Sequence, residues 1–150
     1  MKLKIKKLKE GAKIPVRGSD YAAGYDLFAN NSKATSWNTI VIPAHSTIPV
    51  GTGIAVAIPE GYFGALYARS GLSIRDGLRP GNCVGVIDSD YRGEIIVGLH
   101  NDSDENRTVD IGDRIAQLVI QKFEPIEFEE VESLTKTERG EDGLGSTGTK

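Results

Sequence analysis

The chain alternates between short apolar runs and turn-forming residues over most of its length. In residues 39–69, β-branched residues stand between closely spaced turn formers, which are Pro43, Pro49, Gly51, Gly53, Pro59 and Gly61. The same pattern continues through residues 82–101 and 107–128. Strands of roughly four to eight residues, separated by turns at short intervals, predict an all-β sandwich or barrel.

The two ends of the chain and one internal segment depart from this pattern. The first residues alternate Lys-Leu-Lys-Ile, which predicts a strand with one solvent-exposed face. Residues 69–77 have a helical pattern, with Ser70 expected as the N-cap and Gly77 as the stop. After Phe128 the chain becomes acidic and loses its period. We therefore expect a folded body over residues 1–130 and a flexible C-terminal tail over 131–150.

Composition excludes some classes of protein. With 150 residues, of which 39% are hydrophobic, the chain is long enough for one domain with its own core. A net charge of −3 argues against a nucleic-acid-binding protein, which would usually be basic. No apolar run is long enough for a signal peptide or a membrane span, so no membrane partner is expected.

Cys83 bears on both the compartment and the packing. It is the only cysteine, so it cannot form an intramolecular disulfide, which suggests a reducing compartment. Together with the lack of a membrane span, this predicts a cytoplasmic protein. Because Cys83 lies in a strand-like run, we expect its thiol to pack as a small hydrophobic group.

Residues 81–98 contain the most informative candidate chemistry. An apolar run is followed directly by two acids, Asp88 and Asp90, and then by a second apolar run. We expect a hairpin with the acids at its tip and with Asn82 and Ile96 facing each other at its mouth. Asp88 is expected to be partly buried, where a carboxylate beside phosphates can act as a general base on water. A solvated turn is the structural alternative.

Residues 68–75 offer a possible phosphate-binding arrangement. Arg69 can pair with phosphate oxygens through two N–H groups. Ser70 and Gly71 stand where a helix would begin, a position that suits an anion. The alternative is an ordinary capped surface helix, which the spacing alone favours.

Two further polar residues stand in largely apolar segments. Asp26, between Tyr25 and Leu27, is either a paired structural acid or a ligand to a cation, and the residues alone favour the structural interpretation. Gln117 is expected on the polar face of an alternating strand, near Arg114. An ordinary strand edge is the alternative for Gln117.

The tail contains the parts of a phosphate cradle. Residues 139–148, RGEDGLGSTG, combine one arginine, two hydroxyl groups and glycines that leave the backbone accessible. They do not follow a strand and open a helix, so they do not form a Walker-type loop.

Taken in order, five stretches resemble the five motifs of the trimeric deoxyuridine triphosphatases (dUTPases). They are AAGYDLFA (22–29), ARSGLSIR (68–75), GNCVGVIDSDYRGE (81–94), GDRIAQLVI (112–120) and RGEDGLGSTG (139–148). The resemblance implies an all-β, jelly-roll-like fold and a homotrimer with active sites shared between subunits. It also implies that dUTP is cleaved to dUMP and pyrophosphate with Mg2+, by water attack on the α-phosphorus. Such a reaction lowers dUTP and supplies dUMP for thymidylate synthesis.

The resemblance further implies a role for each residue of the body. Uracil is expected in the third motif, against Asn82 and backbone groups near Val86, Ile87 and Ile96. Asp88 is expected to activate the water, and Tyr91 to lie under the sugar and leave no room for a 2′-hydroxyl. The phosphates are expected to be bound by Arg69, Ser70, Gly71 and Gln117. Asp26 is expected to contact the metal shell through water.

The fifth motif is expected to close as a lid over a site made mainly by other subunits. Arg139 would reach the terminal phosphate, and the triphosphate would be wrapped by Gly145, Ser146 and Thr147. The family usually carries an aromatic residue in this motif that stacks on uracil, whereas this chain has Leu144. The lid is therefore expected to hold the base more weakly.

Two other functions share some of these features. A dCTP deaminase has the same fold, but the tip of the third motif and the compact chain favour dUTP as the substrate. A non-catalytic trimeric β-sandwich that binds nucleotide or a partner would not need Arg69, Asp88 and Arg139 together.

Overall fold

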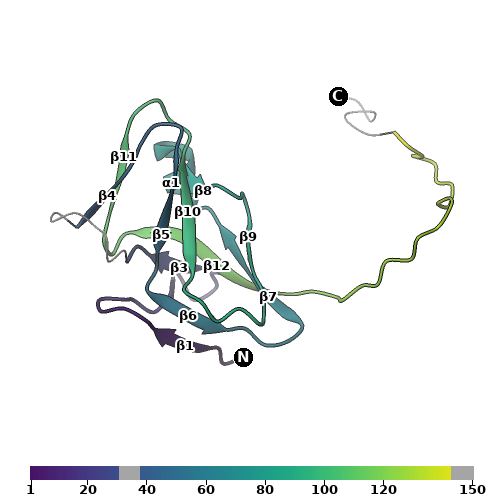
Figure 1. Ribbon diagram of the computed structural model, residues 1–150, viewed down its shortest axis with the longest axis horizontal. Helices are drawn as coiled ribbons and strands as arrows, with labels where there is room; N and C mark the ends of the chain where they lie inside the picture. The colour runs from purple at the N-terminus through teal and green to yellow at the C-terminus, as the bar shows by residue number, and fades with distance from the viewer. Residues whose placement is uncertain (31–37, 143–150) are drawn as a thin grey trace.

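The computed structural model of the chain describes residues 1–30 and 38–142, and these confirm an all-β fold with one short helix (Figure 1). The described elements are β1 (Lys4–Lys7), β2 (Val16–Arg17), β3 (Tyr25–Phe28), β4 (Thr39–Ile42), β5 (Thr47–Gly51), β6 (Ile54–Ala57), β7 (Tyr62–Tyr67), α1 (Ser70–Asp76), β8 (Leu78–Pro80), β9 (Gly85–Ile87), β10 (Ile96–Asn101), β11 (Arg107–Asp110) and β12 (Arg114–Lys122). Among these elements, no helix has the length and apolar character needed to span a bilayer.

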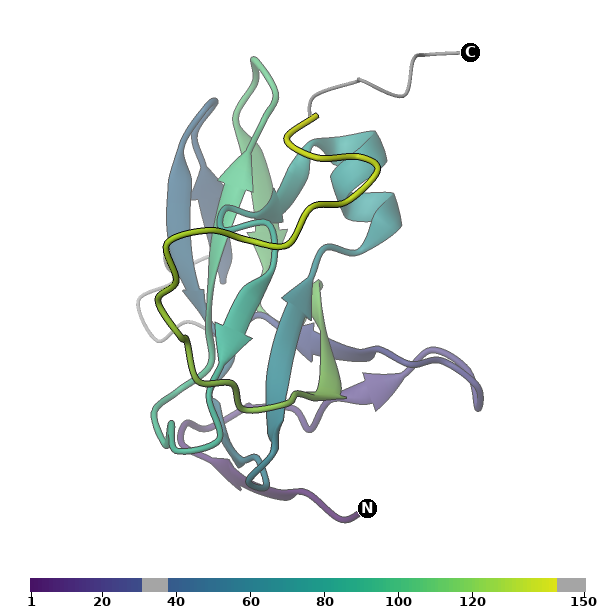
Figure 2. The same ribbon diagram turned by 90° about the vertical axis from the view of Figure 1, so that its right-hand side faces the viewer.

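The strands pair in antiparallel fashion and build a jelly-roll-like sandwich. The largest sheet has the strand order β2-β3-β12-β7-β9, and a three-stranded sheet has the order β5-β10-β8. Two further pairs, β1 with β6 and β4 with β11, complete the sandwich. Figures 1 and 2 show α1 at one end of the body and β1 at the other.

The core lies between the three-stranded and the five-stranded sheets. Every second residue of β10 is buried, so Val97 and Leu99 face the interior. Leu27 of β3 and Leu118 of β12 belong to the same cluster and come from the facing sheet. Burying each such aliphatic side chain stabilises the fold by about 1.5–3 kcal/mol. The alternation that predicted strands thus also supplies the core.

The helix begins one residue differently from the prediction. Arg69, with an extended backbone, occupies the N-cap position, and no side chain caps the helix there. The expectation that Ser70 is the N-cap was wrong, because Ser70 already lies in the first turn. Gly77 ends the helix as expected, with a left-handed φ of 69° and its N–H donating to the carbonyl of Leu72.

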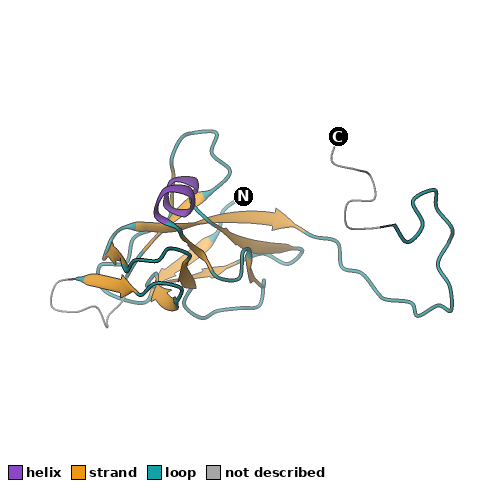
Figure 3. Cartoon of the chain, turned by 90° about the horizontal axis from the view of Figure 1, so that it is seen from above, coloured by secondary structure: helices purple, strands orange, loops and turns teal. Residues whose placement is uncertain are grey.

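Beyond β12 the chain leaves the body. Residues 123–142 contain no strand or helix and are exposed. Figures 1 and 3 show this segment leading away from the sandwich. Its apolar side chains remain in solvent, since Phe128 is 93% exposed and Ile126 is 68% exposed. The division into a body over 1–130 and a lid over 131–150 stays a prediction.

Candidate active site

A pocket of about 230 Å³ opens where β9 and β10 diverge. Six of the predicted site residues line it, namely Asn82, Val86, Ile87, Asp88, Tyr91 and Ile96. The remaining lining comes from Leu66, Gly85, Glu94 and Ile95. The structure therefore gathers the residues of the third motif around a single concavity.

The pocket exists because β9 and β10 do not pair with each other. β9 pairs with β7 at the edge of the five-stranded sheet, whereas β10 pairs with β5 and β8 in the other sheet. The expected hairpin of two paired arms was therefore wrong, although Asn82 and Ile96 do line the same pocket. The separation leaves the outer edge of β9 with backbone groups that can bind a ligand.

Asp88 is exposed in the chain, so the expectation of partial burial was also wrong. Along β9, Gly85 and Ile87 are buried while Val86 points outward. Asp88 follows at the next outward position and then enters a turn, in which the N–H of Tyr91 donates to the carbonyl of Asp88 at 3.2 Å. The carboxylate is consequently free to meet a ligand in the pocket.

The ring of Tyr91 is held against the loop that follows Asp88. Its hydroxyl donates to the carbonyl of Glu94 at 3.0 Å. Gly93 makes room for the ring, since a Cβ at Gly93 would lie 2.5 Å from Cζ of Tyr91. The position of this aromatic ring is thus set by the backbone of residues 93 and 94.

A second group of predicted residues meets around Asp26. This aspartate is 3% exposed and accepts from Nε of Arg69 at 2.9 Å and from Nη1 of Arg114 at 3.2 Å. Gln117 lies opposite Asp26 in the β3–β12 ladder, and its Nε2 lies 3.5 Å from the carboxylate. Asp26 is therefore a paired acid, the interpretation that the residues alone favoured, and it links the first, second and fourth motifs.

Ser70 and Gly71 lie in the first turn of α1 and are both exposed. A Cβ at Gly71 would meet no atom within 4 Å, so the backbone there is open to an approaching group. Together with Arg69, these residues form a polar, accessible surface at the start of the helix.

The described part of the tail does not reach this surface within one chain. Arg139 donates from Nε to the carbonyl of Asp142 at 2.9 Å in a local turn. Figures 1 and 3 show this part of the tail away from the sandwich. The other predicted lid residues, Leu144, Gly145, Ser146 and Thr147, lie outside the described residues.

Cys83 stands next to the pocket residue Asn82 and corrects another expectation. Its thiol is exposed rather than packed in the core. Cys83 has a φ of 62° and its N–H donates to the carbonyl of Pro80 at 3.1 Å, so it belongs to a tight turn between β8 and β9. The apolar residues around it in sequence had suggested a strand.

Sequence reasoning missed the anchoring role of Glu94. The carboxylate of Glu94 lies within 2.9 Å of Nζ of Lys9 and accepts from the N–H of Gly53 at 2.8 Å. The acid stands directly before an apolar run, which was a signal that it could be drawn inward. Its partner 85 positions away in sequence could not be identified from the pattern.

No metal centre is formed by protein side chains alone in the parts of the chain that the structure describes. Residues 1–30 and 38–142 contain no group of three or more His, Cys, Asp or Glu side chains placed to hold a metal ion. Each oxygen of the Asp26 carboxylate already has an arginine partner.

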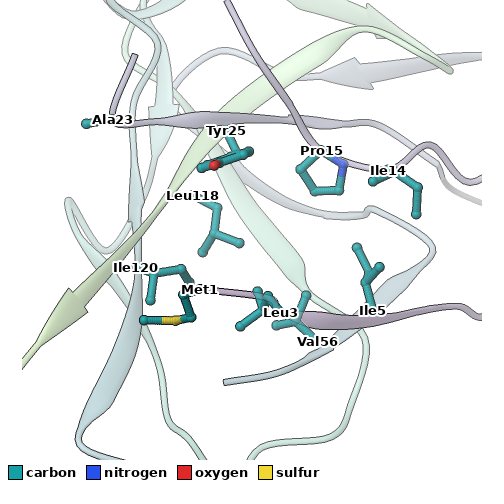
Figure 4. A pocket seen from close by; sticks show the side chains of 10 residues that line it. All are labelled: Met1, Leu3, Ile5, Ile14, Pro15, Ala23, Tyr25, Val56, Leu118 and Ile120. Atoms are coloured by element: carbon teal, nitrogen blue, oxygen red, sulfur yellow. The ribbon is translucent and has the colours of Figure 1, made fainter. Parts of the chain in front are cut away.

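A larger pocket, of about 460 Å³, lies between the N-terminal segment, β6 and β12 (Figure 4). It is lined by apolar and aromatic side chains from Met1, Leu3, Ile5, Ile14, Pro15, Ala23, Tyr25, Val56, Leu118 and Ile120. It has no charged side chain that could orient a nucleotide. The smaller pocket beside β9 is therefore the better candidate for the active site.

Comparisons with known proteins show which enzyme family the chain resembles. The dUTPase family model matches residues 10–148. The deoxyuridine 5′-triphosphate nucleotidohydrolase of Corynebacterium glutamicum is 48% identical, over 97% of this chain and 94% of that protein. The one from Oryza sativa subsp. japonica is 47% identical, over 97% of this chain and 80% of that protein. Among solved structures, the dUTPase of Staphylococcus bacteriophage 80alpha with dUPNHPP superposes with a TM-score of 0.86 at 31% identity, covering 98% of each chain.

Proposed function

The chain belongs to the dUTPase family and hydrolyses dUTP, and we propose that the pocket beside β9 holds the uracil and deoxyribose during that reaction. One observation carries the proposal: six residues assigned from the third motif line a single concavity. Its volume of about 230 Å³ is below the roughly 300–1,000 Å³ of complete small-molecule sites. It suits a base with its sugar and leaves the triphosphate outside.

The base is read by Asn82 and by the backbone near Val86, Ile87 and Ile96. Uracil presents an N–H flanked by two carbonyl oxygens, and backbone N–H and C=O groups are complementary to such an edge. The support for this assignment is the outer edge of β9, which pairs with no strand on the pocket side among the described residues. Cytosine carries an amino group at the 4-position, so a backbone donor aimed there discriminates against dCTP.

Asp88 acts as the general base, and Tyr91 selects deoxyribose over ribose. The exposed carboxylate of Asp88 can accept a proton from a water that attacks the α-phosphorus, producing dUMP and pyrophosphate. The Tyr91 ring, held by Glu94 and Gly93, lies under the deoxyribose and excludes a 2′-hydroxyl. Both residues line the same pocket, as these roles require.

The phosphates are bound by Arg69, Ser70 and Gly71, with help from Gln117. Among the described residues, Arg69 bonds to Asp26 through Nε, which leaves its two Nη groups for phosphate oxygens. The open backbone at Gly71 and the exposed hydroxyl of Ser70 add donors beside them. This surface carries positive charge that favours a triphosphate.

The family is metal-dependent, and we propose Mg2+ as the ion. Mg2+ usually retains several waters and binds through substrate phosphates with one or two carboxylates, which fits a body without a preformed cluster of ligands. When bound, the ion neutralises phosphate charge and polarises the phosphoryl oxygens. Asp26 can hold it only through water, since both carboxylate oxygens already accept from arginines.

We propose a homotrimer whose lid, residues 131–150, closes over a site on another subunit. Two features of the single chain support this. The tail leaves the body, and it exposes Ile126 and Phe128. The apolar pocket of Figure 4 is also uncovered. Burial of both surfaces between chains would stabilise an assembly. Within it, Arg139 contacts the terminal phosphate, and Leu144, Gly145, Ser146 and Thr147 complete the lid.

For the location we propose the cytoplasm. The one cysteine, Cys83, is a free and exposed thiol, which fits a reducing compartment.

Pyrophosphate release measured with dUTP, dCTP, dTTP and UTP tests the proposed recognition. We expect turnover of dUTP to exceed that of the other three, because each differs from dUTP at the base edge or at the sugar. Equal turnover of UTP would contradict the role of Tyr91, and equal turnover of dCTP would contradict the reading of the base. Ammonia release from dCTP would instead indicate a deaminase.

A further inference from the structure

Glu94 lines the proposed active-site pocket, and its carboxylate occupies a slot beside Lys9, Gly51 and Gly53, none of which lines that pocket. The side chain of Glu94 is 16% exposed, and its Oε1 and Oε2 lie 2.9 Å and 2.8 Å from Nζ of Lys9. Oε1 also accepts from the N–H of Gly53 at 2.8 Å. One acid thus joins the pocket to the N-terminal segment and to the turn between β5 and β6.

The slot is shaped for a carboxylate. A Cβ at Gly51 would lie 2.5 Å from Oε1 of Glu94, so only glycine leaves the required space. Gly53 has a φ of 70°, a left-handed backbone that favours glycine, and this conformation presents its N–H to the acid. Removing the lysine or the acid would leave a partly buried charge without its partner.

From this slot a short chain of contacts leads to the reacting groups. The carbonyl of Glu94 accepts from the hydroxyl of Tyr91 at 3.0 Å. The N–H of Tyr91 donates in turn to the carbonyl of Asp88 at 3.2 Å. These two bonds tie the loop of Asp88 and Tyr91 to Glu94, so a displacement of Glu94 on its loop side would be transmitted to Tyr91 and Asp88.

The main chain that follows Glu94 is held by hydrogen bonds that do not depend on the Glu94 side chain. The N–H of Ile95 donates to the carbonyl of Ile54 at 2.9 Å, and the hydroxyl of Thr52 donates to the carbonyl of Ile95 at 2.7 Å. These bonds do not involve the Glu94 side chain, so its loss should leave the strand in place. Residues 88–93, the loop that precedes Glu94, make no backbone hydrogen bond to β5 or β6 among the described residues.

We propose that Glu94, paired with Lys9, is a positioning residue that holds the loop of Asp88 and Tyr91 in the geometry that discriminates dUTP from UTP. The inference rests on the roles proposed above for these two residues. When the Glu94–Lys9 pair is broken, the Tyr91 ring is less constrained, and the pocket can then accommodate the 2′-hydroxyl of UTP.

The experiment compares full-length Glu94→Ala, Glu94→Gln and Lys9→Met with wild type. The control is Lys6→Met, on β1 in the same N-terminal segment, because the Lys6 side chain makes no hydrogen bond or ion pair with the other described residues. For each protein, kcat and KM are measured with dUTP and with UTP, together with Tm and mass by light scattering. We expect Glu94→Ala and Lys9→Met to narrow the ratio of kcat/KM for dUTP over UTP by about tenfold, within the roughly 100-fold that a misplacement of 1 Å can cost.

Glu94→Gln and a double variant provide sharper tests. The amide oxygen of Gln can still accept from Gly53, so this variant should lose less selectivity than Glu94→Ala. The double variant Lys9→Met/Glu94→Gln should be no less selective than Lys9→Met alone, since two partners of one interaction are not additive. Additive losses would overturn the pairing.

The outcomes separate this inference from the proposed function. A wild-type chain that hydrolyses UTP as readily as dUTP contradicts the role of Tyr91 itself. With the wild-type preference established, an unchanged ratio in Lys9→Met, or an equal loss for both nucleotides, overturns the positioning role alone. If Glu94→Ala does not fold, Lys9→Met and Glu94→Gln decide the matter.

Discussion

Asp88 and Asp90 stand two residues apart in the turn after β9, and both side chains are exposed. Asp88 lines the pocket, whereas Asp90 is not among its lining residues. Two chemically identical groups in one turn thus differ mainly in whether they face the proposed substrate. This pair allows position to be tested with charge held constant.

Asp88→Asn should lower kcat by about 10²–10⁴-fold, because the amide keeps the shape but cannot take a proton from water. Binding of a non-hydrolysable dUTP analogue, measured by calorimetry, should remain close to wild type. Asp90→Asn is the matched control and should retain activity. If Asp88→Asn worked within a few-fold of the wild-type rate, the general base would have to be another group.

Gly93→Ala should act on sugar selectivity without touching the substrate. A Cβ at Gly93 would lie 2.5 Å from Cζ of Tyr91, so the ring must move. We expect the preference for dUTP over UTP to narrow in Gly93→Ala, as it should in Tyr91→Ala. Gly18→Ala, where a Cβ would meet nothing within 4 Å, is the control. If Tyr91→Ala lowered the rates with dUTP and with UTP equally, Tyr91 would not exclude the 2′-hydroxyl by steric contact.

At the scale of elements, the strands contribute side chains to the core, whereas the described part of the tail does not. Every strand of the two main sheets except β2 contributes at least one side chain to one buried cluster, so none of these strands can be removed without disturbing the core. The tail after Lys122 contributes no residue to that cluster among the described positions. Its loss should therefore affect function and leave the fold intact.

Truncation after Thr135 should yield a folded protein with Tm near that of wild type. Catalysis should fall steeply, because the removed segment carries Arg139, whose charge is proposed to bind the triphosphate, and because lid closure excludes water. Steady-state pyrophosphate release and thermal unfolding measure the two effects. Full turnover by the truncated chain would show that the tail has no part in catalysis.

The segment around β8 and β10 is expected to respond to acid. Nε and Nη2 of Arg79 donate to the carboxylate of Asp102, and this interaction holds the pKa of Asp102 below its ordinary value. The depressed pKa means that the pair stabilises the fold above about pH 4 and that this contribution is lost as pH falls through the folded-state pKa. His100 also faces Asp102, with Nε2 at 3.3 Å.

The Tm of Arg79→Met should therefore fall less than that of wild type when the pH is lowered from about 5 to about 3. The effect should be small, since the pair is exposed and screened by solvent. Lys4→Met, an exposed lysine on β1, controls for the change in net charge. If Tm fell equally with pH in Arg79→Met and wild type, the pair would make no measurable contribution to stability.

The single chain leaves two apolar surfaces in solvent at the scale of the whole molecule. One is the pocket of Figure 4, and the other is the run of exposed side chains that includes Ile126 and Phe128. Exposed patches of this kind usually mark an interface. Both surfaces support the proposed trimer, because their burial between chains would remove apolar area from water.

Ile126→Asp and Phe128→Asp should shift the assembly toward monomers, because each places a charge in a surface that is proposed to be buried. Glu127→Gln, between them, is the control and should leave the mass unchanged. Light scattering over a range of concentrations measures the shift. A trimer that survives both substitutions would place the subunit interface elsewhere.

Local pattern predicted much of this protein. The spacing of apolar residues and turn formers predicted an all-β fold, because a side-chain period of two reports burial on one face of a strand. Gly77 was predicted as the helix stop, because a left-handed residue favours glycine. The five motifs, read in order, indicated the family and predicted that Asn82, Asp88 and Tyr91 share one site.

Only the tertiary structure decided which segments meet. It assigned β9 and β10 to different sheets and so opened the pocket, and it exposed Asp88 and Cys83. It also paired Glu94 with Lys9 across 85 positions. Composition and periodicity report the environment of a residue relative to its neighbours in sequence. Partners brought together by strand order depend on the whole topology, so sequence pattern indicated the fold class and the family, and the tertiary structure determined which residues meet.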